Sequence, residues 1–195
     1  VGVDLSWGGE DRTCIRFRRG CDARTIPPIY VNGDSSRDPN TMVQILAEIL
    51  NKSYGGKNVD MVFIDSAGIC GPIVRTLREL GYLNINEVNF GAISSNPKYK
   101  LMRSYMWGMM KEALPQLCLD NSSKLAEDLC APEYSFTRKT EILLEPKDQL
   151  RKANRLGRST DDGDALALTY ARPIMTRAAS QKRKGIFRRV RGVAT

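Results

Sequence analysis

Acidic residues stand at three points of the chain where a carboxylate is costly to bury. Asp4 lies inside an apolar strand pattern near the start, and Asp65 directly follows the apolar run VFI. Asp161, Asp162 and Asp164 crowd the start of an otherwise apolar helical pattern. A helix cap or a salt bridge accounts well for any one buried acid, but less well for all of them together. The pattern therefore favours a shared site.

Residue types restrict the chemistry that such a site can perform. The chain contains no histidine, which excludes Ser-His-Asp and Cys-His catalysis and imidazole-bound zinc. Acid–base and metal chemistry must then use carboxylates, lysine, tyrosine or cysteine. Converging carboxylates need a divalent cation to offset their repulsion, and they favour Mg²⁺ or Mn²⁺. Two such ions can activate a water and stabilise the leaving oxygen in phosphodiester hydrolysis.

Apolar patterns predict the strands that would position these acids. Five segments fit the main sheet: residues 1–7, 13–19, 25–31, 59–65 and 85–90. The first three predict an antiparallel meander, with Pro27-Pro28 assigning the third strand to an edge. The fourth is nearly continuous in apolar residues, as in a buried parallel strand. Asp65 would then lie beyond the carboxyl end of a parallel strand, where sheets of this class hold their sites.

Helical patterns alternate with these strands. They cover residues 39–54, 72–80, 98–114, 122–131, 147–155 and 160–171, with two more strands expected at 134–139 and 141–145. The order predicts an α/β fold, a mixed sheet whose first three strands are antiparallel and whose later strands are parallel, with helices on both faces. Ser159 or Thr160 is expected to cap the last helix.

Basic residues account for the net charge through one segment. Residues 172–195 contain eight Lys or Arg residues and no acid, which equals the net charge of +8 for the whole chain. Such a run is typical of a disordered tail that interacts with a polyanion, although a tail that only aids solubility is the simpler alternative. We therefore divide the chain into a domain at 1–172 and a basic tail at 173–195.

Further basic residues precede the acidic helix start. As phosphate contacts we select Lys147, Arg151, Lys152, Arg155 and Arg158, together with Arg103 from the helix at 98–114. Such contacts would be independent of DNA sequence, and a solvated face is the alternative. Lys147 could also stabilise charge in the transition state. The five cysteines lack C-x-x-C spacing and predict reduced cytosolic thiols, and no apolar stretch is long enough for a membrane span.

Five segments together resemble the nuclease domain of the large terminase subunit of tailed bacteriophages, the genome-packaging motor. They are GVDLSWGGEDRT, VFIDSAGICGPIVRTLRELGY, VNFG, YKLMRSYMW and STDDGDALALT, spread over residues 1–172. The resemblance implies a ribonuclease H-like fold and a metal-dependent endonuclease that cuts concatemeric viral DNA.

The resemblance also implies roles for individual acids. The family's first-strand and second-strand aspartates match Asp4 and Asp65, and the aspartate before Ala-Leu in its final motif matches Asp164. These three would be catalytic and would hold two Mg²⁺ or Mn²⁺ ions, with Asp161 as an accessory metal ligand.

The final motif departs from the family's common form. Thr160 stands where a proline is common, and Gly163 where an alanine is common. This loosens the register, so Asp161 and Asp162 remain alternatives to Asp164 as the third ligand.

Partners follow from the same resemblance. They are double-stranded DNA, a terminase ATPase domain in the same full-length chain, the small terminase subunit and the portal protein, in the cytoplasm of the host cell and without a membrane. The chain itself contains no P-loop, and its start directly on a strand suggests a domain cut from a longer protein. Alternatives are a Holliday-junction resolvase-like nuclease, a non-catalytic module that docks DNA or portal, and an actin-like ATPase.

Overall fold

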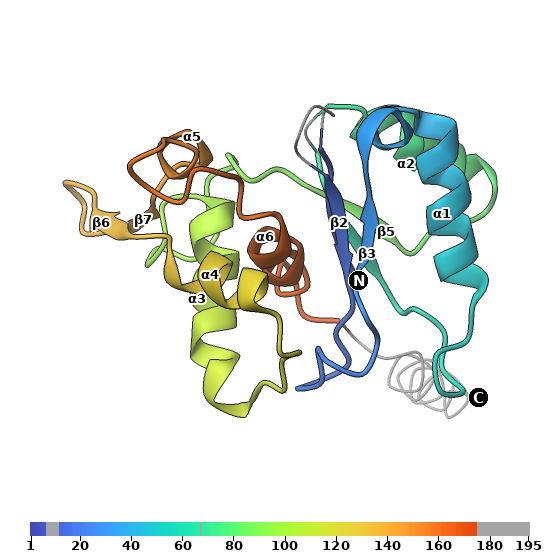
Figure 1. Ribbon diagram of the computed structural model, residues 1–195, viewed down its shortest axis with the longest axis horizontal. Helices are drawn as coiled ribbons and strands as arrows, with labels where there is room; N and C mark the ends of the chain where they lie inside the picture. The colour runs from blue at the N-terminus through green and yellow to red at the C-terminus, as the bar shows by residue number, and fades with distance from the viewer. Residues whose placement is uncertain (7–11, 67, 175–195) are drawn as a thin grey trace, which may run out of the picture.

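A mixed five-stranded sheet organises the computed structural model, which describes residues 1–6, 12–66 and 68–174 (Figure 1). Its strands are β1 (Gly2–Asp4), β2 (Thr13–Arg16), β3 (Ile29–Val31), β4 (Val62–Asp65) and β5 (Ile85–Val88). Their order is β3-β2-β1-β4-β5. β1, β2 and β3 pair antiparallel, whereas β1, β4 and β5 run parallel. The predicted sheet is confirmed, including the edge position of β3. The basic tail lies outside the described residues from residue 175 onward.

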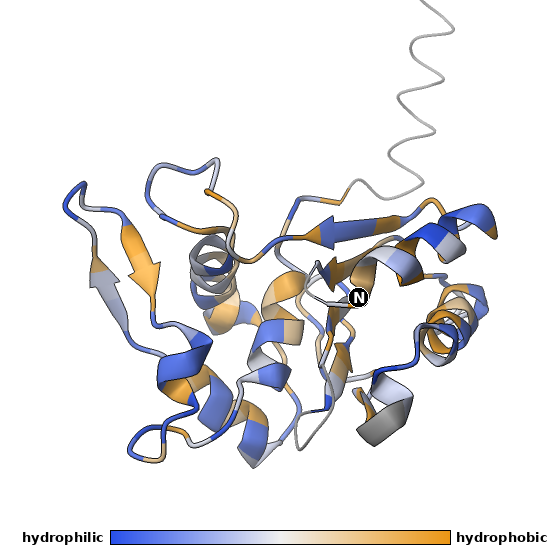
Figure 2. Cartoon of the chain, turned by 90° about the horizontal axis from the view of Figure 1, so that it is seen from above, coloured by the Kyte–Doolittle hydropathy of each residue, from blue (hydrophilic) through white to orange (hydrophobic). Residues whose placement is uncertain are grey.

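Helices cover both faces of this sheet, as predicted. They are α1 (Pro39–Asn51) and α2 (Cys70–Glu79) on one face, and α3 (Met102–Ala113), α4 (Ser123–Cys130) and α6 (Asp161–Leu168) on the other. Successive residues of β4 point to opposite faces, so Ile64 packs into the α1–α2 core and Phe63 into the α6 core. Figure 2 shows that the helices on both faces of the sheet have their apolar and polar residues on different faces of each helix.

The helix α6 is the innermost element of its layer. It packs directly against β1 and β2, while α3 and α4 pack against α6 (Figure 1). The closest approach is at Gly2, where an added Cβ would lie 1.9 Å from the carbonyl oxygen of Ala165. Only glycine fits between strand and helix here, because any side chain would overlap backbone atoms. This contact sets the first turn of α6 beside the carboxyl end of β1.

Two expectations for the segment before and at the start of α6 differ from the structure. The segment expected at 147–155 is helical only as α5 (Lys147–Leu150), because the chain then turns back and the amide of Gly157, at φ +72°, donates to the carbonyl of Leu150. Thr160 stands at the N-cap position of α6 but makes no capping bond through its side chain. Its hydroxyl donates instead to Asp164 Oδ2 at 2.7 Å.

The remaining elements lie outside the main sheet. They are the hairpin of β6 (Tyr134–Phe136) and β7 (Ile142–Leu144), and the 3₁₀ turns Gly33–Ser36 and Leu114–Gln116. The hairpin extends from the α3 side of the molecule (Figure 1). None of the helices in the described part of the chain is long and apolar enough to cross a membrane.

Candidate active site

The predicted acids gather at one end of the sheet. Asp4 and Asp65 end β1 and β4, which are adjacent and parallel. Asp161 and Asp164 lie in the first turn of α6, which packs on β1. A pocket opens at the same end and is lined by residues that follow β4 and β5 and by two basic side chains: Asp65, Ser66, Asn89, Phe90, Gly91, Arg103 and Lys147. Side chains far apart in sequence thus meet where a parallel sheet places its sites.

Asp4 is buried beside a lysine and several other acids. Lys147 Nζ donates to both Asp4 carboxylate oxygens, each at 3.0 Å. Burial raises the pKa of Asp4 well above its usual value, Lys147 opposes this, and Asp164, Asp161 and Asp65 each raise it further. The carboxylate therefore lies in a region where negative charge exceeds positive charge, which is the condition that favours a bound cation.

Asp164 is held by a complete set of donors. Arg103 Nε and Trp107 Nε1 donate to Oδ1 at 2.8 and 2.7 Å, while Oδ2 accepts from Thr160 and Arg103. Lys147 Nζ lies 3.3 Å from Oδ2. Burial alone would raise the pKa of Asp164, but Arg103 and Lys147 hold it well below its usual value. The side chain is fully buried and ties α6 to α3.

Asp161 and Asp65 differ from Asp164 in their access to solvent. Each retains 7% of its surface exposed, whereas Asp164 retains none. Asp65 lines the pocket, and Asp161 is close enough to Asp4 to raise its pKa. The geometry therefore favours Asp161 over Asp164 as the third acid that reaches a bound ion, and the final choice between them stays a prediction.

Asp162 points away from these acids toward the antiparallel strands. Its Oδ1 accepts from Arg16 Nε and Nη2 at 2.9 and 2.6 Å and from the Tyr30 hydroxyl at 2.6 Å. Burial would raise the pKa of Asp162, but these donors lower it. Asp162 thus links α6 to β2 and β3, and it does not face Lys147.

The first turn of α6 is capped from another helix. Asp128 of α4 accepts through Oδ2 from the backbone amides of Asp162 and Gly163, at 3.0 and 3.1 Å. Arg158 in turn pairs with Asp128 Oδ1. Gly163 fits tightly here, since an added Cβ would lie 2.7 Å from the Trp107 ring and 3.2 Å from Asp128 Cβ. The departure of this motif from the common alanine therefore has a packing reason.

The basic residues proposed as DNA contacts fall into different surroundings. Arg103 is buried against Asp164, and Lys147 lies among the acids. Arg155 pairs with Glu145 and Glu133, and Arg158 with Glu127 and Asp128. Arg151 and Lys152 are exposed in the turn that follows α5. Three of the six, Arg103, Lys147 and Arg158, thus contact the acids or the Asp128 cap of the α6 turn, which the sequence pattern alone did not indicate.

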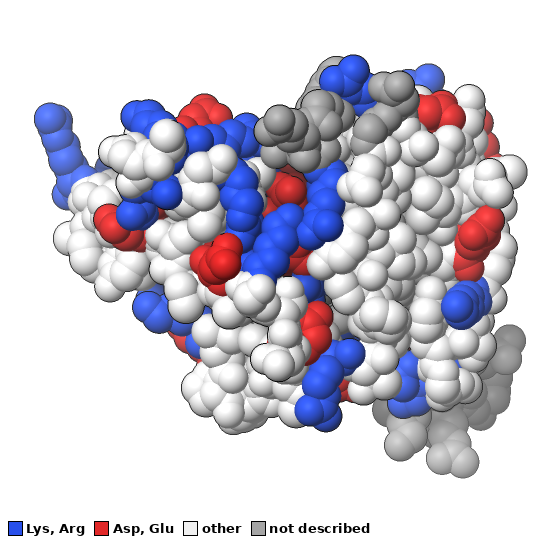
Figure 3. Space-filling view, in the orientation of Figure 1, with Lys and Arg blue, Asp and Glu red and all other residues white. Residues whose placement is uncertain are grey.

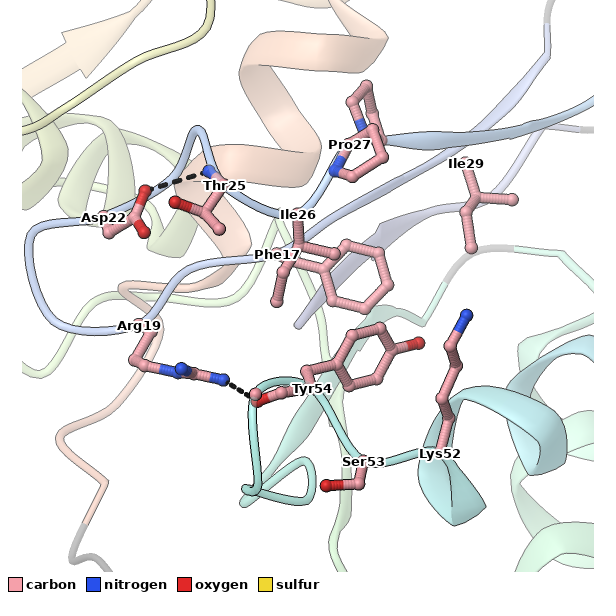
Figure 4. Close-up of a pocket in the computed structure, with 12 residues that line it drawn as sticks. Phe17, Arg19, Asp22, Thr25, Ile26, Pro27, Ile29, Lys52, Ser53 and Tyr54 are labelled. Carbon is pink, nitrogen blue, oxygen red and sulfur yellow. Dashed lines mark hydrogen bonds between the residues drawn. The ribbon is translucent and has the colours of Figure 1, made fainter.

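A second hollow lies at the opposite end of the sheet and holds none of these acids. Its volume is about 480 Å³, and Phe17, Ile26, Pro27 and Tyr54 contribute to its walls. Figure 4 shows Phe17 and Tyr54 facing each other, with their ring centroids 5.2 Å apart. It is separate from the acidic site, because Phe17 follows β2 at the end remote from Asp4.

The sequence interpretation missed several supporting residues. The sequence patterns assign no role at the site to Trp107, Tyr30 or Asp128. Each donates to or caps an acid of the α6 turn from a distant element. A buried aromatic with a polar atom needs a partner, but the sequence contains no signal for which acid supplies it.

Comparison with known proteins agrees with this architecture. No protein-family model and no curated protein matches the chain. The nuclease domain of the large terminase subunit gp2 of bacterial virus Sf6 superposes with a TM-score of 0.64 at 12% identity, covering 89% of this chain and 87% of that chain. A mutant of that domain with manganese gives 0.64 at 13% identity, covering 88% and 87%.

A second bacteriophage provides an independent match. The large terminase nuclease from thermophilic phage G20c with bound magnesium gives a TM-score of 0.56 at 19% identity, covering 88% of this chain and 79% of that chain. The chain therefore has the ribonuclease H-like fold of large terminase nuclease domains, as the sequence resemblance indicated. Identities this low establish the fold alone.

Proposed function

We propose that this domain is a divalent-metal-dependent endodeoxyribonuclease of a viral genome-packaging terminase, cutting concatemeric DNA by two-metal hydrolysis. The observation that carries the proposal is the convergence of Asp4, Asp65 and Asp161 at the carboxyl ends of parallel strands, beside the partly buried Lys147. The shared fold with terminase nuclease domains, some of them solved with manganese or magnesium, supports it.

The donor set fits a hard divalent cation in its chemistry and its charge. Its ligands are carboxylate oxygens, and Asp164, Asp161 and Asp65 add to burial in raising the pKa of Asp4, against the single opposing charge of Lys147. Within the described residues, no group of three or more His, Cys, Asp or Glu side chains is already arranged to hold an ion. Lys147 contacts two of the acids instead. The fit therefore rests on donor type and charge rather than on a closed cage.

The chain's own residues would share the work at the cut. Asp4, Asp65 and Asp161 would hold the ions, while Asp164 keeps the α6 turn and Lys147 in place. Lys147 also carries a positive charge at the site, where it can oppose the charge that develops on a transferring phosphate. The chemistry supplied by bound divalent ions is activation of a water and stabilisation of the leaving oxygen.

The partners follow from the proposed function. We infer that the substrate is double-stranded DNA and that the full-length chain also contains a terminase ATPase domain. The small terminase subunit and the portal protein complete the expected assembly, in the cytoplasm of an infected host cell.

A cleavage assay with matched variants tests the proposal. We expect linear duplex DNA to be cut with Mg²⁺ or Mn²⁺ and to stay intact with chelator. Asp65→Asn should lose at least about a hundredfold in rate, since even outer-shell metal partners are worth that much. Asp60→Asn removes an exposed acid from the other end of β4 and should cut normally. Cleavage in chelator, or equal rates for both variants, would contradict the proposal, and a strong preference for four-way junctions would indicate a resolvase.

A further inference from the structure

A charged cluster beside the acidic site has no role in the proposed cleavage chemistry. It joins β2, β3, α4 and the start of α6 through five charged side chains and a tyrosine: Arg12, Arg16, Tyr30, Asp120, Lys124 and Asp162. Three of the five charges are positive and two are negative. The cluster therefore has an excess positive charge close to the acids.

Arg16 forms the buried centre of this cluster. It is 2% exposed and pairs with Asp162 at 2.6 Å and with Asp120 at 2.9 Å. Asp162 also accepts from Tyr30. Both carboxylates therefore already have their main partner in Arg16. Arg16 balances only one of these two negative charges, so one of Arg12 and Lys124 balances the other and one positive charge remains in excess.

Arg12 and Lys124 are the two outward-facing members. Their side chains are 29% and 30% exposed. Each places a nitrogen 3.6 Å from the same atom, Asp162 Oδ2, which is too far for a hydrogen bond. The two nitrogens are thus separated by no more than twice that distance, a span that one phosphate group can bridge.

Several polar atoms in the cluster are buried without a hydrogen-bond partner among the described residues. They are Arg12 Nε, Asp120 Oδ1 and Asp162 Oδ2. Buried polar atoms are normally satisfied by protein, water or ligand. The Arg12 guanidinium nevertheless has a fixed position, because it lies over the Tyr30 ring at 3.6 Å from the centroid, a cation–π arrangement. The guanidinium is thus held in place while one of its donors, Nε, has no acceptor among the described residues.

The cluster lies beside the proposed cleavage site. Asp4, Cys14 and Tyr30 occupy one row across β1, β2 and β3, so Tyr30 is two strands from Asp4, or about 10 Å at the usual strand spacing. Asp162 directly follows Asp161 in α6. Figure 3, in the orientation of Figure 1, shows basic side chains, with acidic ones among them, gathered in a band over the middle of the viewed face. A DNA backbone held at the acids would continue past the cluster.

We propose that Arg12 and Lys124 bind a backbone phosphate of the DNA a short distance along the strand from the one that is cut. Arg16, Asp162 and Tyr30 position the two cations. The inference rests on the proposed function for its ligand, and it assigns the contact to residues outside the basic run at 147–158. It predicts a sequence-independent contact whose strength depends on salt.

Binding of labelled duplex DNA in chelator tests this assignment without any cleavage. The double variant Arg12→Gln/Lys124→Gln should bind about tenfold more weakly at low salt. Its plot of log affinity against log salt, taken between about 50 and 200 mM, should be shallower by about one. The charge-retaining pair Arg12→Lys/Lys124→Arg should keep most of the slope. The matched control Lys57→Gln/Arg75→Gln removes two exposed cations elsewhere and should resemble the wild type.

Each outcome separates the inference from the proposed function. If the wild type binds DNA and the double variant loses slope, the phosphate contact holds even where no cleavage is found. If the wild type cuts DNA but the double variant matches the control in affinity and slope, the contact is wrong and the nuclease remains. Failure of the wild type to bind duplex DNA would overturn the contact as well. Thermal unfolding of every variant identifies losses that arise from misfolding.

Discussion

Lys147 donates from one ammonium group to both carboxylate oxygens of Asp4, at 3.0 Å each. The lysine comes from α5 and the aspartate from β1, so the contact joins the two ends of the domain's chain. The same nitrogen lies 3.3 Å from Asp164. Burial would lower the pKa of Lys147, but Asp164 and Asp4 raise it. The lysine is therefore charged, and it is the cation of a site rich in acids.

Removal of the Lys147 charge should make the protein more dependent on metal. Lys147→Met leaves buried Asp4 without its partner, which costs about 3–5 kcal/mol in the free energy of unfolding. The melting temperature in chelator should fall, and Mn²⁺ should raise it by more than it raises that of the wild type, since ligands stabilise the state they bind.

A surface lysine provides the control for this experiment. Lys98→Met breaks an exposed ion pair with Glu112 at 2.9 Å, which should change the melting temperature little and should not change the response to Mn²⁺. If Mn²⁺ shifts the melting temperature of Lys147→Met and wild type equally, the lysine and the metal do not share the acids.

Asp161 and Asp164 should separate cleavage from stability. Asp161→Asn should abolish metal-dependent cutting with a smaller change in melting temperature than Asp164→Asn, since it keeps the shape of a side chain that is 7% exposed. Asp164→Asn should lower the free energy of unfolding by about 3–5 kcal/mol, because buried Arg103 loses its charged partner. Cleavage rates measured well below the melting temperatures of the two variants test this assignment. A stable, inactive Asp164→Asn with an active Asp161→Asn would reverse these two roles.

Acid should destabilise the protein partly through Asp164. A carboxyl group whose pKa is depressed on folding adds stability above its unfolded pKa, near 3.9, and loses it as pH falls toward the folded value. Melting temperatures measured in chelator should therefore drop below about pH 4. The raised pKa of Asp4 changes stability with pH in the opposite direction, and it does so in the wild type and in Asp164→Asn alike. The drop should be shallower for Asp164→Asn, and parallel curves would show that Asp164 is not the group responsible.

Gly163 should resist replacement by alanine despite its position in a helix. Alanine favours a helix by about 1 kcal/mol over glycine, but its Cβ would lie 2.7 and 2.9 Å from two Trp107 ring carbons. Overpacking of this kind costs about 1–3 kcal/mol, so Gly163→Ala should lower the melting temperature. Gly71→Ala in α2 meets nothing within 4 Å and should be neutral or stabilising. Equal effects of the two changes would argue against the Trp107 contact.

The sequence predicted the sheet and the place of two acids, because both depend on local patterns. The alternation at β1 and the apolar run of β4 identify strands, and strands that run parallel must end together. Asp65 was therefore expected at the carboxyl end of a parallel strand and Asp4 within the first strand, and the structure places both at one end of the sheet.

The roles within the acidic turn of α6 could not be predicted in the same way. Asp161 and Asp164 are three residues apart and share a face of the helix, whereas Asp162 points to another side. The partners that distinguish them come from distant elements: Arg103 and Trp107 lie on α3, and Arg16 on β2. Thr160 illustrates the same limit, since its expected capping role gives way to a bond with Asp164. Local residue propensities do not indicate which distant residue will bind a given side chain.

The absence of a side chain at Gly2 has a consequence beyond packing. The strand backbone touches α6 at this residue, only two positions before Asp4. A larger residue there would overlap α6, so the helix and its acids would have to move away from β1. The residue at position 2 thus sets the distance between Asp4 on β1 and the acids of α6, although it carries no carboxylate itself.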